Sequence, residues 1–203
     1  MQIIPLFGTH VGVAKLESLD INKALAHVKT LETFTKPGHA HNTVTMRLLH
    51  DPFFSDVKQE CEELSKQYVN IQGYEVNKVK VTASWGNELQ KDDPVNVHNH
   101  PNSFVSGVFY LTNGSPLNFH NPLSAEDLFT FRLKLVHDDE NQYTWQVLKL
   151  PIEPGYLILF PSKVMHHVDP NENDYRYSVA YNTLPLVEYE QGLGNEMNID
   201  TIT

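Results

Sequence analysis

The hydrophobic period of the chain changes once, near Gly73, and this change restricts the folds that the chain can adopt. Before Gly73, residues 18–31 and residues 51–72 carry apolar side chains at helical spacing. The turn residues at 35–38 end the first helix, and Asp51-Pro52 is a typical start for the second. After Gly73, short runs of alternating or wholly apolar residues are separated by turn signals, which is typical of strands.

The resulting order, two helices followed by mostly short strands, predicts the fold class. It indicates a mainly β protein with flanking helices (α+β), an antiparallel sandwich or jelly roll with the helices packed on one face. Polar residues 86–93 are predicted to form a loop. The predicted strands cover residues 1–14 (an opening strand or arm), 43–49, 79–85, 105–111, 129–135, 143–147, 156–160 and 175–182.

Length and charge limit the organisation further. A chain of 203 residues is most simply one domain, 1–203, with N-terminal helices at about 18–70, a jelly-roll core at about 76–184 and a polar, acidic tail at 185–203. The formal net charge of −10 argues against a protein that binds nucleic-acid backbones, which needs a basic patch. Exposed strand edges and the acidic tail make a homodimer a reasonable expectation.

The N-terminal sequence and the apolar runs bear on location. The first residues have no basic region followed by an apolar stretch, as a secretory signal has, and no run approaches the length of a membrane span. We therefore expect a cytoplasmic protein that does not enter a membrane.

Cysteine usage leaves histidine as the main candidate for metal chemistry. Cys61 is the single cysteine, which excludes an intrachain disulfide and a cysteine-based metal cluster. It lies on the apolar stripe of the second predicted helix, so we interpret it as part of the core. Eleven histidines remain.

Three of these histidines form a candidate metal site. His98 and His100 are two apart in an extended segment, so their side chains point to the same side of the chain. His166 follows the apolar strand 156–160 and can supply a third ligand if the strand ends meet. Three neutral imidazoles suit Fe(II), Zn(II) or another first-row ion. The other reading is that the pair only satisfies polar groups at a strand end, and the remaining histidines are interpreted as surface or loop residues, with His39 and His41 able to bind adventitious metal.

A candidate anion site follows ten residues after His166. In the strand 175–182, Arg176 and Ser178 share one face with Ala180 and Asn182. A guanidinium fork and a hydroxyl together can bind a carboxylate through several hydrogen bonds. The alternative is a surface arginine on an edge strand.

These stretches in combination resemble the 2-oxoglutarate- and Fe(II)-dependent oxygenases, most closely a small subfamily from marine bacteria and phages. The resemblance runs from about Ser84 to Asn182, roughly half the chain. It implies a double-stranded β-helix, Fe(II) with 2-oxoglutarate and O₂ as co-substrates, and substrate hydroxylation with release of succinate and CO₂. The motifs are His98-Asn-His-Pro-Asn-Ser, Ser106-Gly-Val-Phe-Tyr-Leu, Gly155-Tyr-Leu-Ile-Leu-Phe-Pro-Ser, His166-His-Val-Asp-Pro and Arg176-Tyr-Ser.

The resemblance also implies roles for single residues. His98 would be the first iron ligand and His166 the distal one, because the family ligand precedes x-Val-x-Pro, which disfavours the competing His167. His100 stands where the wider superfamily has a carboxylate ligand. Arg176 would bind the remote carboxylate of 2-oxoglutarate with help from Ser178. Contacts from Tyr110 and Asn118 to this co-substrate are also expected.

Other functions remain open at this stage. A cupin-like metalloprotein shares the jelly roll and His-x-His, although Phe104 and Val105 stand where a cupin usually has its glutamate. A three-histidine zinc hydrolase or lyase and a non-enzymatic jelly-roll binding module are further alternatives. The substrate, a small molecule or a peptide, is not identified by the sequence. Candidate contacts to it are Asn87, Asn96 and Asn102, with residues 85–96 as a candidate lid.

Overall fold

The computed structural model describes residues 8–122 and 146–186, and two helices and eleven strands are present there. The predicted strand 129–135, most of the predicted strand 143–147 and nearly all of the tail 185–203 lie outside the described residues. The elements, with two short 3₁₀ helices η1 and η2, are β1 (Gly12–Lys15), α1 (Ile21–Val28), β2 (Thr33–Thr35), β3 (His41–Thr43), η1 (Leu48–His50), η2 (Pro52–Phe54), α2 (Ser55–Ile71), β4 (Lys78–Gln90), β5 (Val95–His98), β6 (Val105–Tyr110), β7 (Leu117–His120), β8 (Val147–Leu150), β9 (Tyr156–Pro161), β10 (His166–Val168) and β11 (Tyr175–Leu186).

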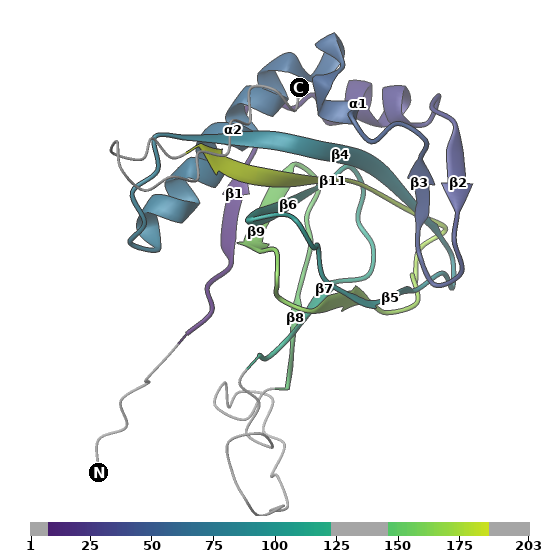
Figure 1. The fold of residues 1–203 in the computed structure, drawn as a ribbon. Helices are drawn as coiled ribbons and strands as arrows, with labels where there is room; N and C mark the ends of the chain where they lie inside the picture. Colours follow the sequence, from purple (N-terminus) through teal and green to yellow (C-terminus); the bar gives the residue numbers. More distant parts are fainter. Residues whose placement is uncertain (1–7, 123–145, 187–203) are drawn as a thin grey trace, which may run out of the picture.

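The strands form two sheets that face each other (Figure 1). The larger sheet has the order β1-β9-β6-β11-β4-β3-β2 and the smaller has the order β5-β10-β7-β8. All pairings between these strands are antiparallel. The predicted jelly roll is therefore confirmed.

Both helices lie on the outer face of the larger sheet, as predicted (Figure 1). Asp20 begins α1 by accepting a hydrogen bond from the Lys23 backbone N–H, and Asp51 accepts one from Phe53 N–H before α2. The apolar faces of the helices cover one of two hydrophobic clusters, and the other cluster lies between the sheets. No helix within residues 8–122 and 146–186 is long and apolar enough to cross a membrane.

Strand β11 separates the helix side from the side between the sheets. Tyr177, Val179 and Tyr181 are buried in the cluster beneath the helices, and the Tyr181 hydroxyl lies 3.0 Å from Ser65 Oγ on α2. The alternate residues Arg176, Ser178, Ala180 and Asn182 face the space between the sheets. This is the division of faces expected from a two-residue period.

Two local predictions are wrong. Residues 86–90 continue β4 and do not begin a loop. The segment lacks the apolar alternation of an ordinary strand because Asn87 faces the cavity, Glu88 accepts from the Tyr177 hydroxyl on the other face, and only Leu89 is a buried apolar residue. Residues 43–49 are not a strand either: β3 ends at Thr43, and Leu48 begins the 3₁₀ helix η1. The apolar residues Leu48 and Leu49 are fully buried there without a sheet partner.

Cys61 is fully buried on α2, as its position on the apolar stripe predicts. Burial raises the pKa of its thiol, so the reactive thiolate is disfavoured.

Candidate active site

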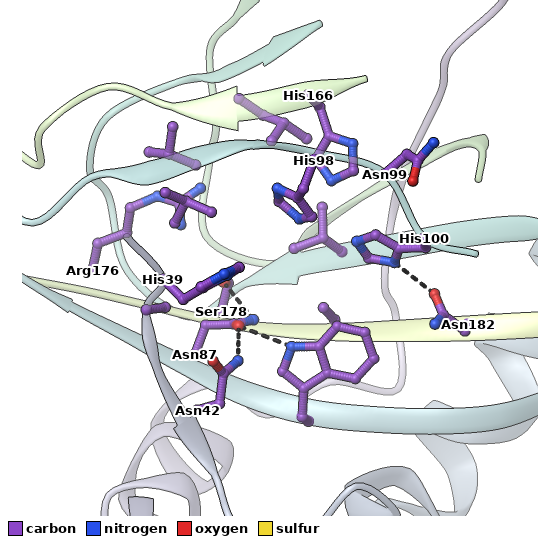
Figure 2. Close-up of a pocket in the computed structure, with 18 of the residues that line it drawn as sticks. His39, Asn42, Asn87, His98, Asn99, His100, His166, Arg176, Ser178 and Asn182 are labelled. Carbon is purple, nitrogen blue, oxygen red and sulfur yellow. Dashed lines mark hydrogen bonds between the residues drawn. The ribbon is translucent and has the colours of Figure 1, made fainter. Parts of the chain in front are cut away.

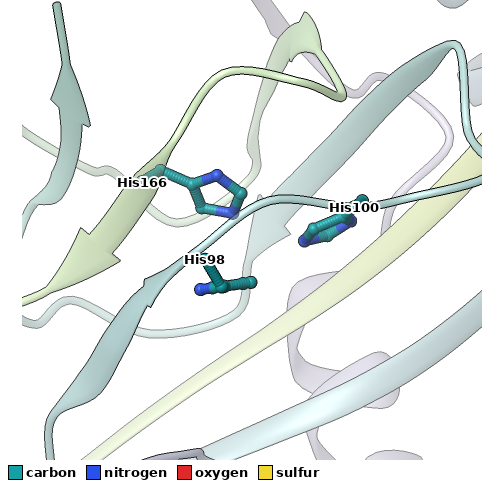
Figure 3. Close-up of side chains that lie close together, drawn as sticks. All are labelled: His98, His100 and His166. Atoms are coloured by element: carbon teal, nitrogen blue, oxygen red, sulfur yellow. The ribbon is translucent and has the colours of Figure 1, made fainter.

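Three histidine side chains meet at one end of the smaller sheet (Figure 3). His98 ends β5 and lies directly opposite His166, which begins the antiparallel neighbour β10. His100 follows two residues later and turns back towards the same point. One ring nitrogen from each histidine lies within 4.8 Å of the others. The two motifs that lie far apart in the sequence are thus brought together by one strand pairing.

Hydrogen bonds determine which nitrogen of each ring faces the centre. His98 Nδ1 lies 2.8 Å from the carbonyl oxygen of Asn96, and His166 Nδ1 lies 2.9 Å from the carbonyl oxygen of Val164. A carbonyl only accepts hydrogen bonds, so both Nδ1 atoms carry the proton and both Nε2 atoms keep a free lone pair. His100 Nδ1 lies 2.6 Å from the amide oxygen of Asn182 and fits the same pattern.

Burial keeps the three rings neutral. It lowers the pKa of His166 to about 3 and the pKa of His100 to about 4, and it also lowers the pKa of His98. Repulsion between the rings adds to the effect at His166 and His100. Three neutral imidazoles with convergent lone pairs are a suitable ligand set for a first-row divalent ion.

His167 points away from this centre. Its Nδ1 lies 2.9 Å from His120 Nε2, and its Nε2 lies 3.2 Å from a carboxylate oxygen of Asp169. The amide of Asn118 contacts the same histidine, at 3.2 Å. Asn118 does not line the cavity that adjoins the triad, because it lies on the opposite face of β7 from the cavity residue Leu117. This placement does not favour its predicted contact with a co-substrate.

A cavity of about 350 Å³ extends from the histidine triad between the two sheets. Figure 2 shows His100 towards one end of the lining and Arg176 at the other. None of the residues that line it is an aspartate or glutamate, although the chain has 25 of these. Its charged lining residues are Lys36 and Arg176. The cavity is therefore suited to anions.

Arg176 is held rigidly at the inner end. Its side chain is 3% exposed, its Nε donates to the carbonyl oxygen of Ser115 at 3.1 Å, and its guanidinium carbon lies 5.1 Å from the centre of the Tyr110 ring. Gly114 makes room for it, since a Cβ there would lie 2.7 Å from Arg176 Cγ. Among the described residues Arg176 has no salt-bridge partner. A buried cation without an anion is unfavourable, so this end of the cavity is prepared for a negative ligand.

Two hydroxyl groups accompany the guanidinium. The Tyr110 hydroxyl is fully buried beside the Arg176 guanidinium, which has donors only, and no described residue accepts a hydrogen bond from this hydroxyl. Burial raises the pKa of Tyr110 to about 12, so it remains a donor at neutral pH. Ser178 Oγ also faces the cavity and lies 3.5 Å from Asn87 Nδ2.

The outer wall of the cavity comes from a hairpin that the sequence analysis did not predict. Residues 36–40 connect strands β2 and β3, and the hairpin contributes Phe34, Lys36, His39 and Asn42 to the lining. Of the proposed substrate contacts Asn87 lines the cavity, whereas Asn96 and Asn102 do not. The residues of this hairpin carry no motif; their position depends on its docking onto β5, where Asn96 N–H donates to Gly38 O at 2.9 Å.

A jelly roll with a partly buried three-histidine cluster and a buried arginine in the same cavity is an arrangement suited to a mononuclear metalloenzyme. Residues 83–182 match the model of the family described as "Putative 2OG-Fe(II) oxygenase". The chain belongs to this family, and the match spans about half of its length. It is therefore an oxidoreductase. No curated protein matches the chain in sequence.

Solved structures agree on the fold. HygX from Streptomyces hygroscopicus, with nickel, 2-oxoglutarate and hygromycin B bound, is 14% identical, with a TM-score of 0.59 over 87% of this chain and 83% of HygX. A Pseudomonas putida prolyl-4-hydroxylase is 12% identical, with a TM-score of 0.59 over 86% and 92% of the two chains. The viral collagen prolyl hydroxylase of Paramecium Bursaria Chlorella virus-1 is 10% identical, with a TM-score of 0.55 over 87% and 96%. At these identities the likeness concerns the fold alone.

Proposed function

We propose that the protein is a 2-oxoglutarate- and Fe(II)-dependent dioxygenase that hydroxylates a small molecule or a peptide, with release of succinate and CO₂. The observation that carries the proposal is the placement of two incomplete sites in one cavity. One end has three convergent imidazoles, and the other has a buried guanidinium with no carboxylate partner and a buried hydroxyl with no acceptor among the described residues. A ligand with a metal-chelating head and a remote carboxylate satisfies both.

The residues present fit these groups. His98, His100 and His166 would hold the iron through Nε2, and Arg176 would pair with the remote carboxylate of 2-oxoglutarate. Tyr110 and Ser178 would add hydroxyl donors to the same carboxylate. With no acidic lining residue and three neutral ligands, the cavity favours a dianion in this position.

The chemistry divides between the bound groups and the protein. When bound, Fe(II) with 2-oxoglutarate and O₂ supplies the oxidising power that places oxygen into a substrate C–H bond. The chain orients 2-oxoglutarate between the triad and Arg176. Apolar residues Val108, Leu117 and Phe160 line the cavity and exclude water, and the hairpin of β2 and β3 contributes the wall that a substrate would contact.

The alternatives explain fewer observations. A cupin-like site or a three-histidine zinc site accounts for the triad. Neither accounts for a buried arginine without a salt-bridge partner among the described residues, beside a buried tyrosine hydroxyl without an acceptor, at the far end of the same cavity.

The test is an anaerobic titration of the apoprotein with Fe(II), followed by 2-oxoglutarate, with visible absorption recorded. We expect a weak metal-to-ligand charge-transfer band that reports chelation. In Arg176→Met, loss of the charge-assisted hydrogen bonds should raise the Kd for 2-oxoglutarate by about 100-fold while Fe(II) still binds. Arg47→Met, which removes an exposed arginine outside the cavity, is the matched control. An equal Kd in Arg176→Met and wild type would contradict the proposal.

A further inference from the structure

The three triad histidines differ in what holds their Nδ1 atoms. For His98 and His166 the partner is a backbone carbonyl, which only accepts. For His100 the partner is the side-chain amide of Asn182, which has a donor and an acceptor on opposite sides. The tautomer of His100 therefore depends on which way this amide faces.

The two orientations of the Asn182 amide have opposite consequences. With the oxygen towards His100, Nδ1 carries the proton and Nε2 has a lone pair for a metal. With the nitrogen towards His100, the amide donates to Nδ1, the ring proton moves to Nε2, and the ring can no longer bind a metal through that atom.

A chain of buried hydroxyls supports the first orientation. Ser106 is paired directly with Asn182 across β6 and β11, and its Oγ donates to Asn182 Oδ1 at 2.9 Å. Ser106 Oγ also lies 2.8 Å from Ser162 Oγ, which in turn lies 2.8 Å from Ser103 Oγ. Ser106 and Ser162 are 0% and 1% exposed, so water does not compete for these bonds. Ser106 Oγ also lies 3.1 Å from His100 Nδ1. A hydroxyl that donates to the amide oxygen favours that oxygen, rather than the nitrogen, on the side of His100, and the Ser106 oxygen can then accept from the same Nδ1–H.

We propose that Asn182 is a positioning residue for the metal centre, in which its amide oxygen, oriented by the Ser106 hydroxyl, holds His100 in the Nδ1–H tautomer that can bind a metal. This inference rests on the proposed function, because it assigns a purpose to the triad. It adds a reason for an amide at this place: an amide orients the imidazole without adding a negative charge, so the bound ion keeps its charge for an anionic co-substrate.

The first experiment reads the tautomers directly in the apoprotein. Histidine side-chain ¹⁵N NMR at neutral pH distinguishes Nδ1–H from Nε2–H rings. We expect all three triad histidines to be Nδ1–H in wild type. In Asn182→Leu only the His100 signals should change, with His98 and His166 as internal controls. Asn87→Leu removes another cavity amide that contacts no histidine, and should leave the three tautomers unchanged.

The second experiment measures the Kd for Fe(II) alone under anaerobic conditions. Asn182→Leu should weaken binding by about 10- to 100-fold, the usual effect of losing the partner of a ligating histidine. Asn182→Asp should not weaken it, because both carboxylate oxygens accept. Ser106→Ala should weaken binding when residue 182 is Asn, and have no effect in the Asn182→Asp background, where orientation no longer matters.

The outcomes separate this inference from the proposed function. An unchanged His100 tautomer in Asn182→Leu, or an equal effect of Ser106→Ala in both backgrounds, would overturn the role of Asn182. Should Asn182→Leu fail to fold, Ser106→Ala gives the same two readouts with the loss of one hydroxyl. A wild-type protein that binds no Fe(II) would refute the proposed function, while the tautomer measurement on the apoprotein would still decide the orientation of Asn182.

Discussion

Burial of a polar group in the cavity costs free energy when no hydrogen bond within the protein compensates for the lost contact with water. Five buried side-chain atoms have no hydrogen-bond partner among the described residues, and of these only the Tyr110 hydroxyl belongs to a residue that lines the cavity. An unsatisfied buried hydroxyl destabilises a fold by roughly 1–3 kcal/mol. We infer that a ligand which accepts a hydrogen bond from the Tyr110 hydroxyl offsets the free-energy cost of burying it. Removal of this hydroxyl should therefore raise the stability of the apoprotein and lower its affinity for the ligand.

The change Tyr110→Phe tests this opposition. The free energy of unfolding of the apoprotein should rise by about 1 kcal/mol, because an unsatisfied group is removed, whereas the affinity for 2-oxoglutarate should fall by about 10-fold. Urea denaturation and the charge-transfer titration measure the two quantities. Tyr177→Phe is the control on the other face of β11: its hydroxyl donates to Glu88 at 2.8 Å, so its loss should lower stability and leave 2-oxoglutarate affinity unchanged. Parallel behaviour of the two variants would argue against a ligand role for Tyr110.

At the scale of elements, the hairpin of β2 and β3 forms one edge of the larger sheet and part of the cavity wall. Its tip is attached to β5 at Gly38, where φ is +74° and an added Cβ would lie 1.9 Å from Asn96 Nδ2. Only glycine permits this approach. The attachment also places His39 beside the triad, with its ring centre 6.3 Å from that of His98.

A matched pair of glycine variants separates backbone strain from loss of docking. Gly38→Ala and Gly73→Ala both place a side chain at positive φ, at about 1 kcal/mol or more each, but an added Cβ at Gly73 meets no atom within 4 Å. We therefore expect Gly38→Ala to lower the free energy of unfolding more. It should also accelerate hydrogen exchange of the Asn96 amide, which donates to Gly38 O. Equal destabilisation with unchanged exchange would show that the hairpin tip is not held there.

At the scale of the whole molecule, the candidate metal centre lies where the two sheets approach each other. His98 and His166 belong to the smaller sheet, while His100 is hydrogen-bonded to Asn182 on the larger one. A bound ion would link ligands anchored on both sheets, and global stability should therefore depend on metal occupancy.

Metal titration of stability tests this dependence. Fe(II) at 100 times its Kd, under anaerobic conditions, should raise the free energy of unfolding by about 2.7 kcal/mol, and a chelator should reverse the change. His98→Gln should show no such increase. An equal increase in this variant would place the stabilising ion elsewhere.

The sequence was most informative where apolar pattern and burial coincide. The helix α2 and the strands β9 and β11 follow from periodicity alone, and the alternation within β11 correctly separates its two faces. Strands β2, β3 and β10 are three residues each and are defined by their pairing partners, which no local pattern reports. Residues 86–90 of β4 do not read as a strand because their polar side chains fall on both faces, with Asn87 in the cavity and Glu88 against Tyr177.

The same reasoning applies to the site. Spacing predicted that His98, His100 and His166 would converge and that Arg176 would face them, and the structure brings these residues to one cavity. Asn182 shares its face of β11 with Arg176, so its place in the cavity could also be predicted from the two-residue period of the strand. The contribution of the hairpin of β2 and β3, including His39, could not be predicted from the sequence, because it depends on a docking contact between residues more than fifty positions apart in the chain.

The different partners of the triad histidines also bear on how such a site can diversify. Backbone carbonyl oxygens remain whatever the side chain, so a substitution at Asn96 or Val164 leaves the hydrogen-bond acceptors of His98 and His166 in the chain. The acceptor for His100 is a side chain, and a single nucleotide change can convert an asparagine codon into one for aspartate. Residue 182 is thus the place where natural variation or directed evolution could adjust the electronic character of the metal without altering a ligand.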